Sequence, residues 1–113
     1  MKDFLFVYRA DYKAIATDSP EVMQARTKMW MDWIGGIAAQ NKLASQGNRL
    51  CPDGKVVKAD NVVTDGPYTE IKESIMGYSI VKVASYEEAV ELAKGCPVLL
   101  GDGNVEVREI SPM

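Results

Sequence analysis

The residues whose types and spacing could support chemistry are concentrated in one short stretch, residues 65–73, which reads DGPYTEIKE. Its Gly66-Pro67 pair must bend the chain, because glycine accepts positive φ and proline fixes φ at about −65°. Several ionisable or aromatic side chains surround this bend: Asp65, Tyr68, Glu70, Lys72 and Glu73. A carboxylate held beside an aromatic wall and a lysine can act as a general acid or a general base.

Two interpretations of this stretch are open. In the first, Asp65 caps the turn and Tyr68 packs, while the charged side chains that follow pair with one another at the surface. In the second, the turn directs the carboxylates of Asp65 and Glu70 into a cleft. Tyr68 then forms a wall of that cleft, and Lys72 supplies the counter-charge.

The cleft interpretation makes Asp65 the candidate catalytic residue, as a general base. An exposed aspartate, with a pKa of about 3.9, is a poor base, so this role requires burial that raises the pKa. Tyr8 or Tyr68 would donate a proton or a hydrogen bond. Arg9 or Arg49 would hold a substrate carboxylate through the bidentate guanidinium fork, and the simpler alternative for each arginine is a weak surface ion pair.

The composition removes several kinds of site from consideration. The chain has no histidine, which excludes Ser-His-Asp and Cys-His catalysis and histidine metal sites. Its two cysteines, Cys51 and Cys96, are far apart and form no Cys-x-x-Cys motif, so we expect free thiols. No acidic loop has the ligand spacing of a calcium or magnesium site, and we expect no metal and no other cofactor.

The distribution of charged residues indicates which binding partners and which cellular location to expect. The net charge is −3, and the 13 Lys and Arg residues are spread along the chain, which argues against nucleic acid and anionic membranes as partners. No uncharged run approaches the roughly 20 residues of a membrane helix. The first residues are typical of a strand rather than a signal peptide, so we expect a cytoplasmic protein.

The first half of the chain predicts the elements that position Tyr8, Arg9 and Arg49. Residues 4–10 form a strand with apolar residues on both faces. Ser19-Pro20 then opens a helix that ends near residues 41–43. Its apolar stripe predicts that four large side chains pack in the core: Met23, Met29, Trp30 and Trp33.

The second half predicts four strands and a shorter helix. The strands cover residues 48–51, 56–64, 78–84 and 105–110, with a hairpin turn at residues 52–55. The helix begins with a capping box, in which Ser85 reaches forward and Glu88 reaches back. Gly95 is expected to cap its C-terminus.

This order predicts one α+β domain over residues 1–113. It matches a ferredoxin-like split βαβ, with an antiparallel sheet and an extra β-hairpin. In that fold the helices cover one face of the sheet and leave the other bare. Because the strands carry apolar residues on both faces, we expect a homodimer joined through the bare sheet faces.

The chain also resembles a known family, the YCII-related or DGPF-domain proteins, over nearly its whole length. The resemblance rests on spaced motifs: Asp65-Gly66-Pro67-Tyr68, Glu70, Lys72-Glu73, Gly77-Tyr78, the Ser85–Ala89 helix start, Cys96-Pro97 and Val105-Glu106-Val107-Arg108. Tyr68 stands where the name DGPF has phenylalanine. The resemblance implies a dimeric α+β barrel.

Two functions follow from these residues and from the resemblance. In the first, a small carboxylate-bearing molecule binds in a cleft beside residues 65–72, with lyase- or isomerase-type acid–base chemistry as an open question. The histidine–aspartate pair that the resemblance implies cannot be carried over, since the chain lacks histidine. In the second, the protein is a non-catalytic regulatory or accessory partner of an alternative sigma factor, a link that the resemblance alone implies.

Overall fold

The computed structural model describes residues 1–11, 17–66 and 74–112. The elements in chain order are β1 (Lys2–Arg9), α2 (Pro20–Ala39), β2 (Leu43–Arg49), β3 (Gly54–Val57), the 3-10 helix η1 (Ala59–Asn61), β4 (Val63–Gly66), β5 (Ile75–Val83), α3 (Tyr86–Ala93), the 3-10 helix η3 (Pro97–Leu100) and β6 (Asn104–Glu109). Neither helix among these residues combines the length and apolar composition needed to cross a bilayer.

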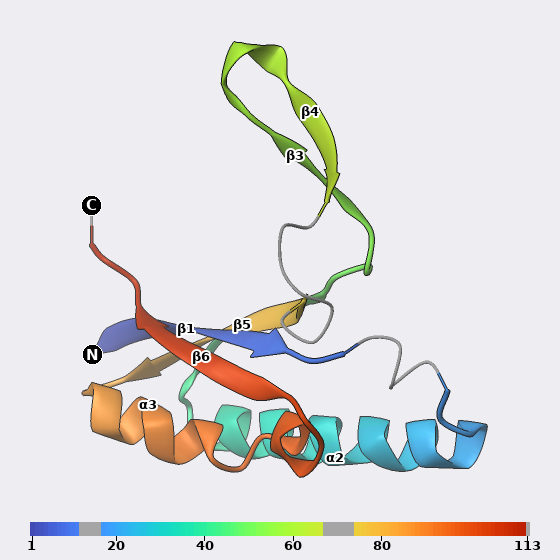
Figure 1. Cartoon of the computed structure of the whole chain (residues 1–113). Coiled ribbons are helices and arrows are strands. Elements are labelled where there is room, and N and C mark those ends of the chain that lie inside the picture. The colour runs from blue at the N-terminus through green and yellow to red at the C-terminus, as the bar shows by residue number, and fades with distance from the viewer. Residues whose placement is uncertain (12–16, 67–73, 113) are drawn as a thin grey trace.

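Four strands form one antiparallel sheet, in the order β2-β5-β1-β6. Both α2 and α3 lie on the same face of this sheet, and the opposite face is bare (Figure 1). Strands β3 and β4 form a separate two-stranded sheet that rises on the bare side. This arrangement confirms the predicted α+β, ferredoxin-like fold with an extra hairpin.

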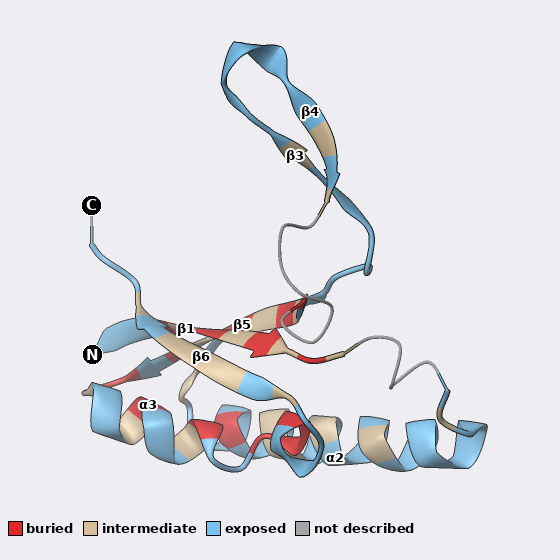
Figure 2. Ribbon diagram, viewed as in Figure 1, coloured by how far each residue is buried: buried red, intermediate tan, exposed pale blue. Residues whose placement is uncertain are grey.

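The core lies between the sheet and the helices (Figure 2). In β1 the side chains of Phe4, Phe6 and Tyr8 are buried, while the residues between them are half-buried, as the two-residue period of a strand requires. Val81 and Val83 of β5 complete the buried layer from the neighbouring strand. The first strand is therefore central to the fold, as its sequence predicted.

The start of α2 is the one that the sequence predicts, and its end comes at least two residues before the predicted end at residues 41–43. The Ser19 hydroxyl accepts a hydrogen bond from the Val22 N–H at 3.2 Å, and Pro20 occupies the first turn. The helix ends at Ala39, two residues before Asn41, whose φ of 60° lies in the left-handed region.

The predicted burial of the apolar stripe of α2 is only partly correct. Trp30 and Trp33 pack against the core, but Met23 and Met29 are each 43% exposed, so their prediction as core residues is wrong. Along α2, which the structure describes from end to end, Ile37 alone is buried. The helix is thus held to the core by its C-terminal half.

The hairpin differs from its prediction. The turn predicted at residues 52–55 and the continuous strand over residues 56–64 are wrong, because the chain turns between Lys58 and Val62 instead. The Lys58 N–H donates to the Val62 carbonyl at 2.6 Å, and Asp60 and Asn61 take positive φ values of 63° and 62°. Aspartate and asparagine tolerate this region better than other non-glycine residues, so the sequence did hold a signal for the turn.

The cap of α3 is confirmed in part. The Ser85 hydroxyl accepts from the Glu88 N–H at 3.2 Å, whereas the Glu88 carboxylate accepts from the Ala84 N–H rather than from that of Ser85. Gly95 does not take positive φ, so its prediction as a left-handed cap is wrong. Its role is close approach, because a Cβ there would lie 3.2 Å from the Trp33 ring.

Both cysteines are free thiols, as predicted. Cys96 is buried in the core, where burial raises the pKa of its thiol to about 12. Cys51 is exposed.

Gly47 provides a test of the β2 backbone. Its φ is 72°, and a Cβ there would lie 1.7 Å from the Tyr78 carbonyl oxygen. We expect Gly47→Ala to lower the free energy of unfolding by about 1–3 kcal/mol, measured by urea unfolding followed by circular dichroism.

The matched control is Gly36→Ala on the exposed side of α2, where an added Cβ meets nothing within 4 Å. This variant should raise the free energy of unfolding by roughly 0.5–1 kcal/mol, because alanine favours the helix. An unchanged urea midpoint for Gly47→Ala would contradict the described β2 geometry.

Candidate functional site

A cavity of about 560 Å³ lies between α2 and the sheet. Strands β1, β2 and β5 form its floor, and the helix passes over it. Most of its lining is apolar and includes Met23, Trp30, Met31, Ile34, Leu43 and Met76. An apolar hollow of this volume, with a few polar groups that converge on it, is typical of a small-molecule site.

The sequence leaves this space empty for two local reasons. Gly35 of the lining leaves open space where a side chain would stand, whereas a Cβ at Gly47 or Gly77 would meet the backbone of the neighbouring strand. In addition, α2 is anchored by Trp33 and Ile37 in its C-terminal half, so the side chains of its first half do not reach a packed sheet surface.

Tyr8, like Ser79, is a buried polar residue of the lining. Its side chain is 5% exposed, and its ring lies edge-on to that of Trp30 with centroids 4.7 Å apart. The neighbouring Ser79 hydroxyl donates its own proton to the Gln46 carbonyl at 2.7 Å. Within the described residues, the Tyr8 hydroxyl has no hydrogen-bond partner.

Burial raises the pKa of Tyr8 well above its usual value, and the nearby Ser79 hydroxyl offsets this only in part. The buried Cys96 thiol adds to the increase in the pKa. Tyr8 therefore stays protonated at any physiological pH. It therefore cannot act as a base.

Two arginines line the same cavity from different elements. Arg49, at the end of β2, is exposed and so lies at the opening. In the part of the chain that the structure describes, it has no ion-pair partner. Arg26 of α2 is instead paired with Asp18. The Arg26 Nη1 and Asp18 Oδ2 atoms are 2.5 Å apart, and the contact is an ion pair without the alignment of a hydrogen bond. Arg49 is thus the cation that remains available to a ligand.

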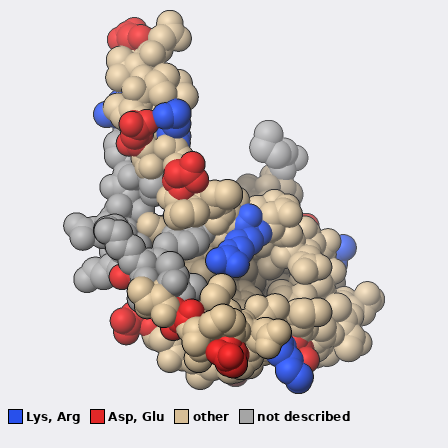
Figure 3. All heavy atoms as spheres, turned by 90° about the vertical axis from the view of Figure 1, so that its right-hand side faces the viewer, with Lys and Arg blue, Asp and Glu red and all other residues tan. Residues whose placement is uncertain are grey.

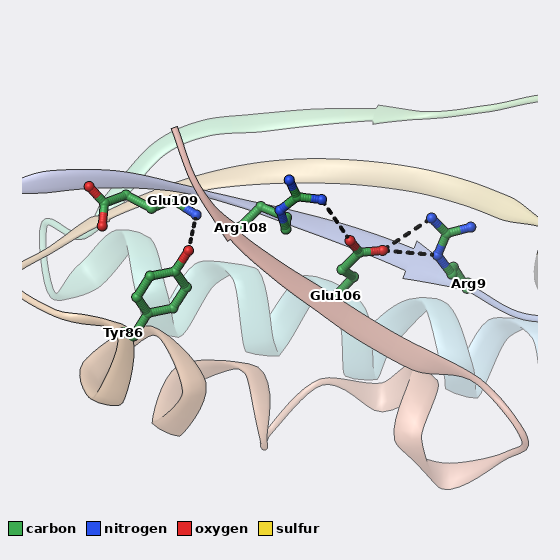
Figure 4. Close-up of polar contacts among 5 residues, drawn as sticks. All are labelled: Arg9, Tyr86, Glu106, Arg108 and Glu109. Carbon is green, nitrogen blue, oxygen red and sulfur yellow. Dashed lines mark hydrogen bonds and ion pairs between the residues drawn. The ribbon is translucent and has the colours of Figure 1, made fainter. Parts of the chain in front are cut away.

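Arg9 lies on the opposite face of the sheet from Tyr8, since neighbouring strand residues point to opposite faces. Its guanidinium pairs with Glu106 at 3.1 Å, and Arg108 approaches the same carboxylate at 3.2 Å (Figure 4). These hydrogen bonds, first from Arg108 and then from Arg9, lower the pKa of Glu106. On the helix side of the sheet, the Glu109 N–H at the strand end donates to the Tyr86 hydroxyl of α3 at 2.8 Å (Figure 4).

The structure places Asp65 on β4, away from Tyr8 and Arg49. Its side chain is 91% exposed and forms an ion pair with Lys55, its cross-strand neighbour. The other predicted site residues, Tyr68, Glu70 and Lys72, lie outside the described residues. Of the predicted residues that can be placed, Tyr8 and Arg49 meet at one cavity, and Arg9 and Asp65 do not.

Sequence reasoning missed two parts of this cavity. It treated Trp30 as core packing alone, although the ring also forms a wall. It used Gly77 only as part of a family motif, although an added Cβ there would lie 2.7 Å from the Asn48 carbonyl oxygen. A lone glycine inside a central strand is a signal of close backbone approach, and it could have indicated this position.

The described lining contains no Asp, Glu, Lys, Cys or His side chain. Residues 1–11, 17–66 and 74–112 also bring together no group of three potential metal ligands. What the described residues can do is bind and orient a ligand by hydrogen bonding, apolar contact and one positive charge.

Charged side chains of both signs are interspersed over the face shown in Figure 3. This face therefore carries no continuous basic patch of the kind that phosphate backbones bind.

Comparison with known proteins bears on the whole domain. No curated protein matches the chain. The YCII-related domain family matches residues 5–113, a range that runs from β1 through β6 and includes every residue of the cavity lining. The chain therefore belongs to the YCII-related domain family.

Proposed function

We propose that this protein binds a small organic molecule bearing a carboxylate, in the cavity between α2 and the sheet. One observation carries the proposal: an apolar cavity has Arg49, which has no ion-pair partner among the described residues, at its opening. Arginine is the side chain best suited to grip a carboxylate.

The proposed function is ligand binding, and it includes no catalytic step. Lyase- or isomerase-type chemistry needs a base, and the described lining offers none, because the raised pKa of Tyr8 keeps it protonated. Asp65 stays a predicted base, and its exposed ion pair with Lys55 argues for a structural role in the described state. The contribution of Tyr68, Glu70 and Lys72 also stays a prediction.

The lack of a base in the described lining favours a second candidate function. In this candidate the protein is a non-catalytic sensor or accessory protein whose bound ligand alters its contacts with a partner. An alternative sigma factor is the partner that the sequence resemblance implies. The ligand site is the same for both functions, so ligand binding is the first property to test.

A thermal-shift screen of small carboxylic acids tests the site. An acid at 100 times its Kd should add about 2.7 kcal/mol to the stability. Arg49→Gln should weaken binding at least tenfold in calorimetric titration, because a hydrogen bond to a charged group contributes about 1.5–3 kcal/mol and 1.4 kcal/mol is tenfold.

Arg108→Gln is the matched control, since it removes an exposed arginine on the opposite face and leaves the cavity unchanged. The proposal fails if no acid in a broad set stabilises the protein, or if both arginine variants weaken binding equally.

We further propose that the bare sheet face is buried against the same face of a second copy. Leu5 and Ile80 are cross-strand neighbours on this face, and with Val7 they form a half-buried apolar strip. The hairpin over residues 54–66 rises on the same side (Figure 1). None of its residues, all of which are described, is buried, and Val57 is 73% exposed. An isolated two-stranded hairpin is marginally stable, so contact with a partner copy would support it.

Ile80→Lys tests the dimer. A lysine in the middle of the apolar strip should separate the copies, and light scattering after size exclusion should give half the wild-type mass. Leu100→Lys is the control, because Leu100 is 75% exposed on η3, in the helix layer. A wild-type protein that is monomeric at micromolar concentration, or an Ile80→Lys variant of unchanged mass, would contradict the dimer.

A further inference from the structure

The cavity is elongated, because it follows one stripe of α2 and most of β2. On α2 its lining residues recur at helical spacing from Met23 to Ala38. On β2 the lining includes both ends of the strand, Leu43 and Arg49. Only three residues join the end of α2 to the start of β2, so Leu43 lies beside the end of the helix.

The pairing of β2 with β5 sets the distance between the two ends of the β2 wall. Arg49 pairs with Gly77 and Leu43 pairs with Val81. The register shifts in β2 take up two residues, so its ends are only four β5 residues apart. At about 3.3 Å per residue, this separation is roughly 13 Å.

The helix wall gives an independent measure of the same stretch. Tyr8 lies in the same row of the sheet as Arg49, and its ring centroid is 4.7 Å from that of Trp30. Ala38, the last α2 residue of the lining, follows Trp30 by eight positions, or about 12 Å at 1.5 Å per residue. The strand therefore runs back along the helix, and both walls give one length from the Arg49 end to the Leu43 end.

The polar side chains of the lining offer a ligand few free hydrogen bonds. The Thr27 hydroxyl donates to a carbonyl of the preceding helical turn at 2.9 Å, and the Ser79 hydroxyl donates to a β2 carbonyl. The Asn48 amide donates to the Tyr78 hydroxyl at 3.2 Å. The Tyr8 hydroxyl is fully buried, so it does not face the open space. The body of a ligand would therefore meet mainly apolar side chains.

The available charge lies at one end of this stretch. Arg49 has no ion-pair partner among the described residues, whereas Arg26 is already in an ion pair. Toward the other end the lining residues are apolar: Ile34, Ala38 and Leu43. A carboxylate held at Arg49 would therefore direct the rest of the ligand along an apolar path.

The methionines of the lining suit a flexible ligand. Met23 and Met31 are 43% and 69% exposed although they border the cavity, and Met76 is half-buried. Exposed apolar side chains gathered around a hollow indicate a surface that a ligand covers. Because methionine is unbranched and adapts its shape, these walls fit a chain of variable conformation better than one rigid outline.

We infer that the ligand is a medium-chain aliphatic monocarboxylic acid, with its carboxylate at Arg49 and its chain directed along the cavity toward Leu43. A staggered chain with C–C bonds of about 1.5 Å advances roughly 1.3 Å per carbon, so a stretch of roughly 13 Å holds about ten carbons. This inference rests on the proposed binding function and adds the class and the direction of the ligand.

A series of straight-chain acids tests the chain length: hexanoate, octanoate, decanoate and dodecanoate, each below its critical micelle concentration. In calorimetric titration the affinity should rise up to about fourfold per methylene as far as decanoate and then level off. Equal affinities for hexanoate and decanoate would overturn the inference. An undiminished rise from decanoate to dodecanoate would also overturn it, because it would indicate adsorption without a defined end.

Decanedioate tests the direction of the chain. It has the length of decanoate, but its second carboxylate would lie at the apolar end of the cavity. It should bind at least tenfold more weakly than decanoate, because a buried charge without a partner is costly. Equal binding of the two acids would contradict an apolar end at Leu43.

Ala38→Trp tests the position of the chain, since a large side chain there should fill the Leu43 end. This variant should weaken decanoate at least tenfold and leave hexanoate unchanged. Ala39→Trp is the matched control, because Ala39 is the next residue of α2, equally exposed and outside the lining. The two variants should share one urea midpoint, and an unchanged decanoate affinity in Ala38→Trp would overturn the inference.

Arg49→Gln distinguishes this inference from the proposed function, and it should weaken every acid of the series by the same factor. If it does so while the affinity is independent of chain length, the carboxylate site stands and the inference about the chain is overturned. If no carboxylic acid binds in a manner that depends on Arg49, the proposed function fails and the inference fails with it.

Discussion

The anchoring of α2 at its C-terminal half is the interaction on which the rest of the structure depends. Trp33 stacks near Phe6 and donates its indole N–H to the Leu92 carbonyl at 3.0 Å, and Ile37 is buried beside it. These contacts join the helix to both the sheet and α3. Because the first half of α2 has no equivalent buried residue, the space beneath it stays open. The cavity is thus a consequence of where the helix is held.

The core beside that open space holds one unfavourable feature. Nearly all buried polar groups in proteins find a partner, and the Tyr8 hydroxyl finds none among the described residues. Exceptions of this kind are expected at functional sites, where a binding requirement overrides local stability. Gly77 and Gly47 let β2 and β5 approach closely beside the cavity, since an added Cβ at either would meet a backbone oxygen of the other strand.

The pleat of β1 divides the molecule into two surfaces with different roles. Tyr8 faces the helices and the cavity, whereas Arg9, the next residue, joins Glu106 and Arg108 on the bare face. A ligand and a second copy of the chain would therefore act on opposite sides of one strand. The proposed ligand site and the proposed dimer interface therefore lie on opposite faces of the same sheet.

The sequence by itself determined the parts of the structure that depend on neighbouring residues. Ser19-Pro20 and Ser85 specify the helix starts, the alternation of β1 specifies its central position, and the order of elements specifies the fold. Sequence also identified Tyr8 and Arg49 as candidates for binding. Only the tertiary structure decided that they share a cavity while Asp65 does not, because that depends on the pairing of three strands far apart in the chain. The amphipathic period of α2 likewise predicts which face turns inward, but not how closely the helix approaches the sheet.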